Sequence, residues 1–452
     1  MMPHYSKNIS PDSLTGMVFA MEGIAHSVVL LNGPMGCKFY HSTTSEFLTV
    51  RPLKQRFMDL DNMNDFFFRQ VRVPCTYLDR HDYVYGTADK VAAALDYLKE
   101  SIPFDLLTVI NSPGASLIGD DLKSIIAAHL PDKPCLMLES PGYSQTFASG
   151  YETATLELIK TLMPEKPAAT DRKSVTTTDH RPTVNLLGLS LWQRYIDGDK
   201  AELIRLFDLA GITVNTCLCA GSSLDEIRRL PEADLNIVIY PEMGARTAAL
   251  LRERCGTPCL IPEGPPIGFA ATEALIREAC SRLGMENPAQ AFITDNEKKR
   301  AICWYKLNEM FAICGRPRGT RFSIEGDASV VLAYSRFFMD YLGMVPDVLD
   351  ITDDQWADAA AESTTIEALN DLLSAHQAGD PRTGDMFKTE AELVFGNANT
   401  IAALKTRPRP FCGIEISLPG MGYTDIVPKT HLGHTGAMFL TEQVLNGLMS
   451  RL

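Results

Sequence analysis

The sequence predicts an α/β protein made of three doubly wound domains, each with a parallel sheet covered by helices. Two observations lead to this prediction. Short apolar runs rich in Val, Ile and Leu alternate with stretches of helical periodicity along the chain. These runs fall into three sets of four, and a polar stretch without apolar periodicity, at 166–181, separates the first set from the second. With 452 residues, the chain is long enough for three domains.

The predicted elements follow one another in the order strand, loop, helix. The first set has strands at 27–31, 71–77, 105–111 and 135–139, with a helix at 89–100. The second set has strands at 184–190, 212–218, 235–240 and 259–262, with helices at 200–209 and 270–283. The third set has strands at 321–325, 346–351, 392–395 and 412–418, with helices predicted at 296–314, 353–386 and 435–452. The domains are therefore expected at 1–168, 182–295 and 296–452.

Composition and charge exclude several classes of partner. The net charge of −14 argues against nucleic acid, because phosphate binding requires basic patches. No apolar run approaches the roughly eighteen residues of a membrane span, and the first residues lack a secretory signal, so a cytoplasmic protein is expected. The eleven cysteines include no CxxC pair, which indicates reduced thiols, or metal ligands drawn from distant positions.

One cysteine follows the first predicted strand, and another lies near the end of the second, directly after a proline. Cys37 ends the segment GPMGC, in which Pro34 and Gly36 break the strand, and Cys75 follows Pro74. Glycine lets the backbone approach a bulky ligand, and the start of a helix favours the thiolate that binds iron or zinc. Because ligands bind beyond the carboxyl ends of strands in open α/β sheets, both thiols could reach one metal centre. A buried apolar cysteine at each position is the alternative.

The remaining loops of the first domain are rich in glycine. The third strand runs into INSPGASLIGDDL, which contains Gly114, and the fourth into ESPGYSQTFASG. Asp120 and Asp121 are explained well enough as helix caps. All four strands therefore open into glycine-rich turns, which is more than packing requires.

These segments, in this order, resemble component 1 of the nitrogenase family. The resemblance rests on GPMGC, LDRHDYVYGTADK, SLIGDDL and SPGYS, and on the later segments RFSIEGDASVVLAYSRFFMDYLGM, FGNANTIAAL, SLPGMGYTD and HLGHTGAMFLTEQVLNGL. The family includes dinitrogenase subunits, cofactor-assembly scaffolds, the dark-operative protochlorophyllide and chlorophyllide reductases, and the reductive cyclase of coenzyme F430 synthesis. The match covers nearly the whole chain, and the order of the motifs is more specific than any one of them.

The resemblance implies three Rossmann-like domains per subunit and a pair of subunits with an iron–sulfur cluster at their interface. It also implies an ATP-hydrolysing Fe protein as the electron donor. Cys37 matches the glycine-preceded cluster cysteine of the family, and Cys75 lies near a ligand position of some members. Pro34, Gly36 and Gly114 are then expected beside the cluster.

This chain departs from the family at three places. The segment SPDSLTG lacks the N-terminal cysteine of many members, and Pro113 stands where others have a cysteine before the IGDD turn.

Two cysteines from each of two identical subunits would supply the four ligands of a [4Fe–4S] cluster, so a homodimer is favoured over a heterodimer with a related subunit. At the position of the dinitrogenase cofactor cysteine the chain reads Tyr240-Pro241-Glu242, so neither an iron–molybdenum cofactor nor nitrogen fixation is expected.

Four histidines are of interest for this chemistry. His431 and His434 lie in KTHLGHTG, in a predicted loop before the last helix, and are candidate catalytic proton donors. A surface or capping role is the alternative. His41 and His81 flank the cluster segments and could donate hydrogen bonds to cluster sulfur.

The sequence therefore predicts a nitrogenase-like reductase that passes electrons from an Fe protein to a conjugated, tetrapyrrole-like or otherwise hard-to-reduce small molecule, in a cleft between the three domains. Two alternatives remain. One is a scaffold for metallocofactor assembly without turnover, and the other is a binding protein of the same fold that has lost the redox site.

Overall fold

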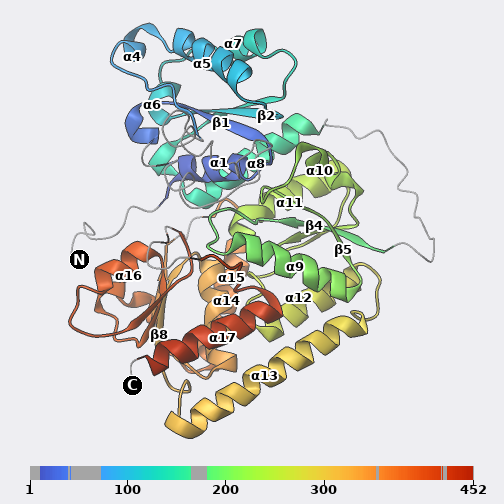
Figure 1. The fold of residues 1–452 in the computed structure, drawn as a ribbon, viewed down its shortest axis with the longest axis vertical. Coiled ribbons are helices and arrows are strands. Elements are labelled where there is room, and N and C mark those ends of the chain that lie inside the picture. The colour runs from blue at the N-terminus through green and yellow to red at the C-terminus, as the bar shows by residue number, and fades with distance from the viewer. Residues whose placement is uncertain are drawn as a thin grey trace.

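Three parallel sheets with helices packed around them confirm the predicted α/β class (Figure 1). The computed structural model describes residues 11–38, 41, 73–163, 181–352, 356–418, 420 and 425–450. Each predicted domain span contains one sheet, while the boundary positions at 168, 182, 295 and 296 stay predictions. No helix among the described residues is long and apolar enough to cross a bilayer.

The first sheet has the strand order β1-β2-β3. Its strands are β1 (Ser27–Asn32), β2 (Leu106–Asn111) and β3 (Cys135–Glu139). One face packs against α5 (Ala88–Ser101) and α7 (Leu122–His129), and the other face packs against α1 (Ser13–Glu22) and α8 (Phe147–Leu162) (Figure 1). Because both faces are covered, all the side chains of β1 and β2 are buried, which explains their uninterrupted apolar runs.

The prediction of a strand at 71–77 is wrong: the described residues 73–77 do not form a continuous strand. Residues 71 and 72 lie outside the described residues, and beyond them only Cys75 pairs with β1, in a parallel bridge to Leu31. Leu31 donates its N–H to the carbonyl of Pro74 at 2.9 Å, and Thr76 donates to that of Leu31 at 3.1 Å. Pro74 has no N–H to extend this ladder, so the segment contacts the sheet at one point only.

The second sheet has the strand order β5-β4-β6-β7. Its strands are β4 (Thr183–Leu187), β5 (Thr213–Cys217), β6 (Leu235–Val238) and β7 (Cys259–Leu260). The main helices around it are α9 (Ile196–Ala210), α11 (Pro241–Cys255) and α12 (Phe269–Arg282), and the short α10 (Leu224–Arg228) follows β5. The predicted strands of this sheet are therefore all present, although each is shorter than expected.

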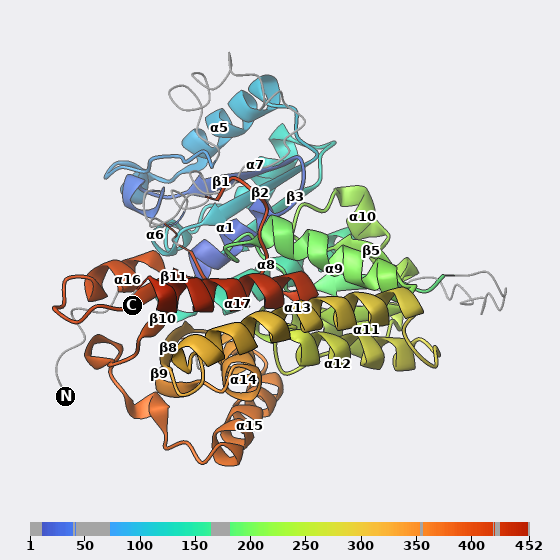
Figure 2. The same ribbon diagram turned by 60° about the horizontal axis from the view of Figure 1, so that its bottom comes forward.

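The third sheet has the order β11-β10-β8-β9. Its strands are β8 (Arg321–Gly326), β9 (Val345–Ile351), β10 (Leu393–Gly396) and β11 (Cys412–Glu415). Its helices are α14 (Ala328–Arg336), α15 (Ala359–Ala375), α16 (Ala398–Leu404) and α17 (Gly433–Met449), and α17 lies beside the long α13 (Gln290–Cys314) (Figure 2). Helix α17 begins two residues earlier than predicted, so His434 lies in its first turn and not in the preceding loop.

Helix α1 joins the first sheet to the second. All ten of its residues are buried, and Gly16 and Gly150 let α1 and α8 approach so closely that a Cβ at either position would lie 2.0 Å from a backbone oxygen of the other helix. Beyond α1, Ala25 donates its N–H to the carbonyl of Ser222 at 2.8 Å. One apolar core consequently continues from the first sheet through the other two.

Candidate functional site

Cys37 and Cys75 lie together at the carboxyl edge of the first sheet. After β1 the chain passes Gly33 and turns at Pro34, whose carbonyl accepts the N–H of Cys37 at 3.1 Å. Cys75 lies beside the end of β1, and its Sγ donates to the carbonyl of Gly33 at 3.2 Å. The two sulfurs are close enough for the charge of Cys37 to raise the pKa of Cys75.

Both cysteines are partly buried thiols. Burial raises the pKa of Cys37, although a hydrogen bond with Ser112 works in the opposite direction. Burial likewise raises the pKa of Cys75, against the effect of the Tyr77 N–H, which donates to its Sγ at 3.4 Å. The expectation that this turn favours the thiolate is therefore wrong for the free chain, because desolvation outweighs the local donors. A metal ion would have to displace the protons to bind here.

A row of hydrogen bonds fixes the strand ends that carry the two cysteines. Thr76 donates to Asn32 Oδ1 at 2.8 Å, and its hydroxyl accepts the N–H of Gly33 at 3.1 Å. Asn32 Nδ2 donates to Asn111 Oδ1 at 2.8 Å, and Asn111 Nδ2 donates to Glu139 Oε1 at 2.9 Å. Buried polar groups with satisfied partners restrict movement, so the ends of all three strands hold the Cys75 loop in place.

The other residues expected beside the cluster lie around these thiols. Gly36 is exposed, and a Cβ added to it would meet nothing within 4 Å. A Cβ on Gly114 would lie 3.0 Å from the hydroxyl of Tyr83, whose pKa is raised by burial and then by the charges of Cys37 and Cys75. Tyr83 is therefore near both the thiols and Gly114, while Gly36 is open to solvent one residue before Cys37.

The segments that follow β1, Cys75 and β2 expose large apolar side chains. Met35 is 69% exposed, Tyr77 44% and Leu117 88%, and Tyr83, Val84 and Tyr85 are exposed as well. Tyr77 also has φ of 51°, a left-handed conformation that costs about 1–2 kcal/mol in a residue with a side chain. A concentration of apolar side chains on a surface indicates contact with a partner. We call Met35, Tyr77, Tyr83, Val84, Tyr85 and Leu117 the cysteine face.

A cavity of about 690 Å³ opens between the three sheets. It lies beyond the carboxyl ends of their strands, the usual place for a ligand in α/β proteins. Tyr143, which follows β3, lines it from the first sheet, and Tyr240, which follows β6, lines it from the second. From the third sheet it is lined by Glu325, Asp327, Tyr334, Asp350, Asn397 and Ser417.

One pair in this cavity wall was not found from the sequence. His41 Nδ1 lies 3.0 Å from Asp12 Oδ1, and both residues are buried and line the cavity. Asp12 is the N-cap of α1, and its Oδ1 also accepts from the backbone and the hydroxyl of Thr15, each at 3.1 Å. Burial would raise the pKa of Asp12, but the hydrogen bonds and charge of His41 and the bonds from Thr15 lower it, so Asp12 is ionised.

His431 lies behind the cavity wall. Its Nδ1 is 2.6 Å from the hydroxyl of Tyr334, which does line the cavity, and its Nε2 is 2.6 Å from Gln443 Oε1. Burial lowers the pKa of His431 to about 4, so the ring is neutral and accepts the hydrogen bond of Tyr334. Among the described residues, it is Tyr334 that connects His431 to the cavity.

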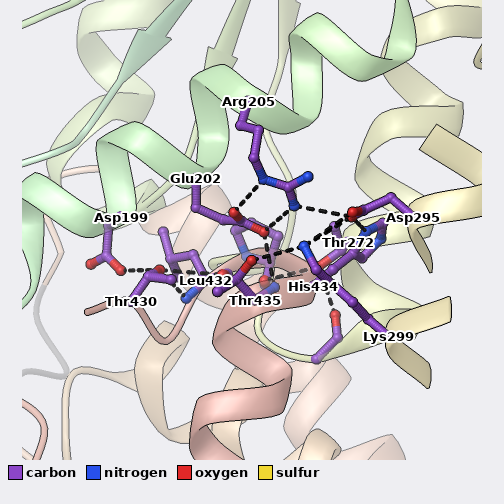
Figure 3. Close-up of polar contacts among 12 residues, drawn as sticks. Asp199, Glu202, Arg205, Thr272, Asp295, Lys299, Thr430, Leu432, His434 and Thr435 are labelled. Carbon is purple, nitrogen blue, oxygen red and sulfur yellow. Dashed lines mark hydrogen bonds and ion pairs between the residues drawn. The ribbon is translucent and has the colours of Figure 1, made fainter. Parts of the chain in front are cut away.

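His434 belongs to a network of ion pairs that holds α17 against α9 and α13 (Figure 3). Its ring is fully buried, and its Nδ1 lies 2.9 Å from Asp295 Oδ2. Asp295 also pairs with Arg205 at 3.0 Å and with Lys299 at 3.1 Å. The structure thus places His434 among packing contacts. His81, in contrast, is exposed at the start of α4 (Asp82–Tyr85), where its ring lies tilted against that of Tyr85 with centroids 4.5 Å apart.

Comparison with known proteins gives consistent results. A family model described as nitrogenase component 1 type oxidoreductase matches residues 13–449. One of the light-independent protochlorophyllide reductase subunits of Synechococcus sp. (strain CC9605) is 28% identical over 406 residues, which cover 86% of this chain and 74% of that protein. The corresponding protein of Prochlorococcus marinus (strain MIT 9211) is 29% identical, with 86% and 73% covered. The solved structure titled "Nitrogenase Cp1 at pH 6.5" has a TM-score of 0.72 at 16% identity, covering 100% of this chain and 95% of that one, which shows a shared fold.

Proposed function

The chain belongs to the nitrogenase component 1 type oxidoreductases, and on this premise we propose that it is the catalytic component of a two-part reductase. In this proposal two copies of the chain hold one [4Fe–4S] cluster between them. A separate ATP-dependent Fe protein supplies electrons one at a time. The substrate is an unsaturated, conjugated small molecule, for which the tetrapyrrole in the name of the relatives is the first model.

The observation that carries the proposal is the convergence of Cys37 and Cys75 on one edge of the first sheet. Among the described residues no group of three or more Cys, His, Asp or Glu side chains could hold a metal by itself. One chain therefore offers two thiols, and a second copy related by a twofold axis would complete the four thiolates of a [4Fe–4S] cluster. The exposed apolar side chains of the cysteine face fit burial against that second copy.

The protein's own part is to hold the cluster and the substrate. The hydrogen-bonded row from Thr76 through Asn32 and Asn111 to Glu139 would fix the two ligands. The bound cluster would supply one-electron transfer. A cavity of about 690 Å³ is in the size range of sites for organic ligands, and Tyr143 and Tyr240 offer aromatic surface to a conjugated molecule.

The first test measures iron and acid-labile sulfide after anaerobic reconstitution, together with the mass of the assembly in solution. The wild-type chain is expected to bind about four of each per dimer. Cys37→Ala and Cys75→Ala should each lose the cluster. The matched control is Cys135→Ala, because Cys135 is also partly buried but begins β3, at the opposite edge of the sheet. Equal iron in all four proteins would refute the site.

A second test addresses the partner. Met35→Glu places a charge on the cysteine face two residues before Cys37 and should give a folded monomer that binds no cluster. Ile313→Glu is the control, since Ile313 is 76% exposed on α13, far from the first sheet (Figure 1). If the wild-type chain stays monomeric and binds iron only together with a related subunit, the active assembly is a heterodimer and the proposed homodimer is wrong.

Turnover separates a reductase from an assembly scaffold. The loaded dimer is incubated with an Fe protein, ATP and protochlorophyllide as the probe, and both ATP-dependent oxidation of the Fe protein and loss of the probe are followed. A reductase oxidises its Fe protein repeatedly, whereas a scaffold keeps its cluster without doing so.

A further inference from the structure

The pair formed by Asp12 and His41 has features that a helix cap does not need. A cap requires only the bond that the backbone N–H of Thr15 donates to Asp12, yet the carboxylate also pairs with His41 Nδ1 at 3.0 Å. His41 Nδ1 lies 3.0 Å from Thr15 Oγ1 as well, so two groups fix the plane of the ring. The ring of Tyr143 packs against it, with centroids 5.8 Å apart.

The second ring nitrogen of His41 remains available. Nδ1 is occupied by Asp12, and Nε2 has no hydrogen-bond partner in the described part of the chain, where His41 lines the cavity. The paired carboxylate also has an unused atom: Asp12 Oδ2 is buried and has no hydrogen-bond partner among the described residues. A charged carboxylate holding one imidazole nitrogen while the other faces a substrate space is an arrangement suited to proton transfer.

We propose that His41 donates protons from Nε2 to the substrate in this cavity, and that Asp12 is the positioning residue that holds the ring for this transfer. The proposal rests on the reductase function proposed above and deepens it. It also differs from the sequence-based expectation, in which His41 would donate a hydrogen bond to cluster sulfur.

Reducing a double bond A=B to HA–BH adds two electrons and two protons. The electrons arrive singly from the Fe protein. His41 as the imidazolium gives the Nε2 proton to one atom of the bond, becomes neutral, and takes a proton back from water for the next transfer. The other titratable groups among the described residues that line this space are Asp12 at the start of α1, Tyr143 after β3, Tyr240 after β6, Tyr334 on α14, and Glu325, Asp327 and Asp350 from the third sheet.

The variants are chosen to separate proton donation from packing. His41→Asn keeps an amide N–H that can reach Asp12 but has no second nitrogen to donate. Asp12→Asn keeps the cap but removes the charge. The control is His129→Asn, because His129 Nδ1 also bonds an aspartate, Asp96, at 2.7 Å, but between the exposed surfaces of α5 and α7.

The first readout needs no turnover. Diethyl pyrocarbonate reacts with an accessible imidazole nitrogen, and peptide mass spectrometry gives the reaction rate of each histidine at one fixed pH. His41 is expected to react at Nε2 through the cavity. In Asp12→Asn this rate should fall, because a carboxylate that holds Nδ1–H makes Nε2 the better nucleophile. A His41 that does not react, or whose rate Asp12→Asn leaves unchanged, would overturn the proposal.

The second readout is turnover of protochlorophyllide by loaded dimers. His41→Asn should retain wild-type iron content and accept the first electron from the Fe protein at the wild-type rate, yet lose about 10²–10⁴-fold in product formation and in sustained oxidation of the Fe protein. His129→Asn should match the wild type. If His41→Asn turns over normally, His41 is not the donor. If the wild type binds no iron, the proposed function fails, and the modification rate alone decides whether His41 has an accessible, Asp12-dependent imidazole.

Discussion

Asn32 donates from Nδ2 to Oδ1 of Asn111 at 2.8 Å, and this buried bond joins the ends of β1 and β2 at the edge where Cys37 and Cys75 meet. The two amides help to determine where the thiols lie, because Asn32 Oδ1 accepts from Thr76, which follows Cys75 directly. The geometry of the candidate cluster site is therefore set by side chains one layer below it.

Thr76→Val should loosen this site. The substitution keeps the shape of the side chain but leaves the N–H of Gly33 and Oδ1 of Asn32 without the hydroxyl. Because buried groups without partners cost about 1–3 kcal/mol each and two are left here, the free energy of unfolding should fall by about 2–6 kcal/mol and iron occupancy should decrease. Thr76→Ser retains the hydroxyl and should behave like the wild type in denaturant titration. Equal stability of the two variants would contradict this account.

Gly150→Ala should destabilise the packing of α1 on α8. The added Cβ would lie 2.0 Å from the carbonyl oxygen of Ser13, which is backbone and cannot turn aside. We expect a loss of about 1–3 kcal/mol or more in unfolding free energy. Gly36→Ala is the control, since its Cβ meets nothing and its stability in the metal-free chain should change by less than about 0.5 kcal/mol.

Asp199→Asn should remove a pH dependence of stability. Burial raises the pKa of Asp199 to about 7, although hydrogen bonds from Thr430 and from the backbone of His431 and Leu432 oppose the shift. The folded state therefore binds a proton that the unfolded state releases near pH 3.8, and this contribution to stability declines as pH rises from about 4 to about 7. Unfolding free energies measured across this range should fall less steeply in the variant.

The control for this prediction is Asp199→Ala. It leaves the hydroxyl of Thr430 and the N–H of His431 without their acceptor, so it should be less stable than the wild type at every pH. If Asp199→Asn keeps the wild-type slope, Asp199 does not take up the proton.

Asp295→Asn should have the opposite pH signature. Burial would raise the pKa of Asp295, but hydrogen bonds from Arg205, His434 and Lys299 lower it to about 2 (Figure 3). The stabilisation is thus complete above the ordinary pKa of 3.8 and is lost as pH falls toward 2. The variant should lose about 2 kcal/mol at neutral pH and show a flatter acid limb in thermal unfolding.

An exposed ion pair provides the comparison for Asp295. Asp225 pairs with Arg228 at 3.0 Å, but its side chain is 88% exposed. Asp225→Asn should change stability by less than about 1 kcal/mol. A similar loss in both variants would mean that the α9–α13–α17 network contributes no more than a surface pair.

The fold could be predicted because its strands are buried on both faces. A strand such as β2 is a nearly continuous apolar run, which is easily distinguished from the helical periodicity of the segments on either side. The prediction failed at 71–77, where an apolar run interrupted by Pro74 makes one bridge in place of a strand. It also failed at the start of α17, where Gly433 begins the helix without a capping side chain.

The candidate site could be predicted only in part. Cys37 and Cys75 follow consecutive apolar runs. Because the carboxyl ends of parallel strands lie at the same edge of a sheet, the sequence predicts that the two cysteines are close together. Asp12 and His41 share no motif, and Asp12 alone has the sequence pattern of an ordinary helix cap. Only the path of α1 beneath the first sheet brings the two into one cavity wall, and no local pattern encodes that path.

The position of α1 has a consequence for how the protein is made. A Cβ on Gly23, at the end of this helix, would lie 1.8 Å from the carbonyl oxygen of Cys219, and Gly23 accepts the N–H of Gly221 at 2.6 Å. The ribosome synthesises the first residues of the chain long before it reaches this stretch. Helix α1 can therefore be fully buried only after about half of the polypeptide has been synthesised. If the Cys37 turn holds the proposed cluster, its insertion into the fully packed first domain would follow translation of the second sheet.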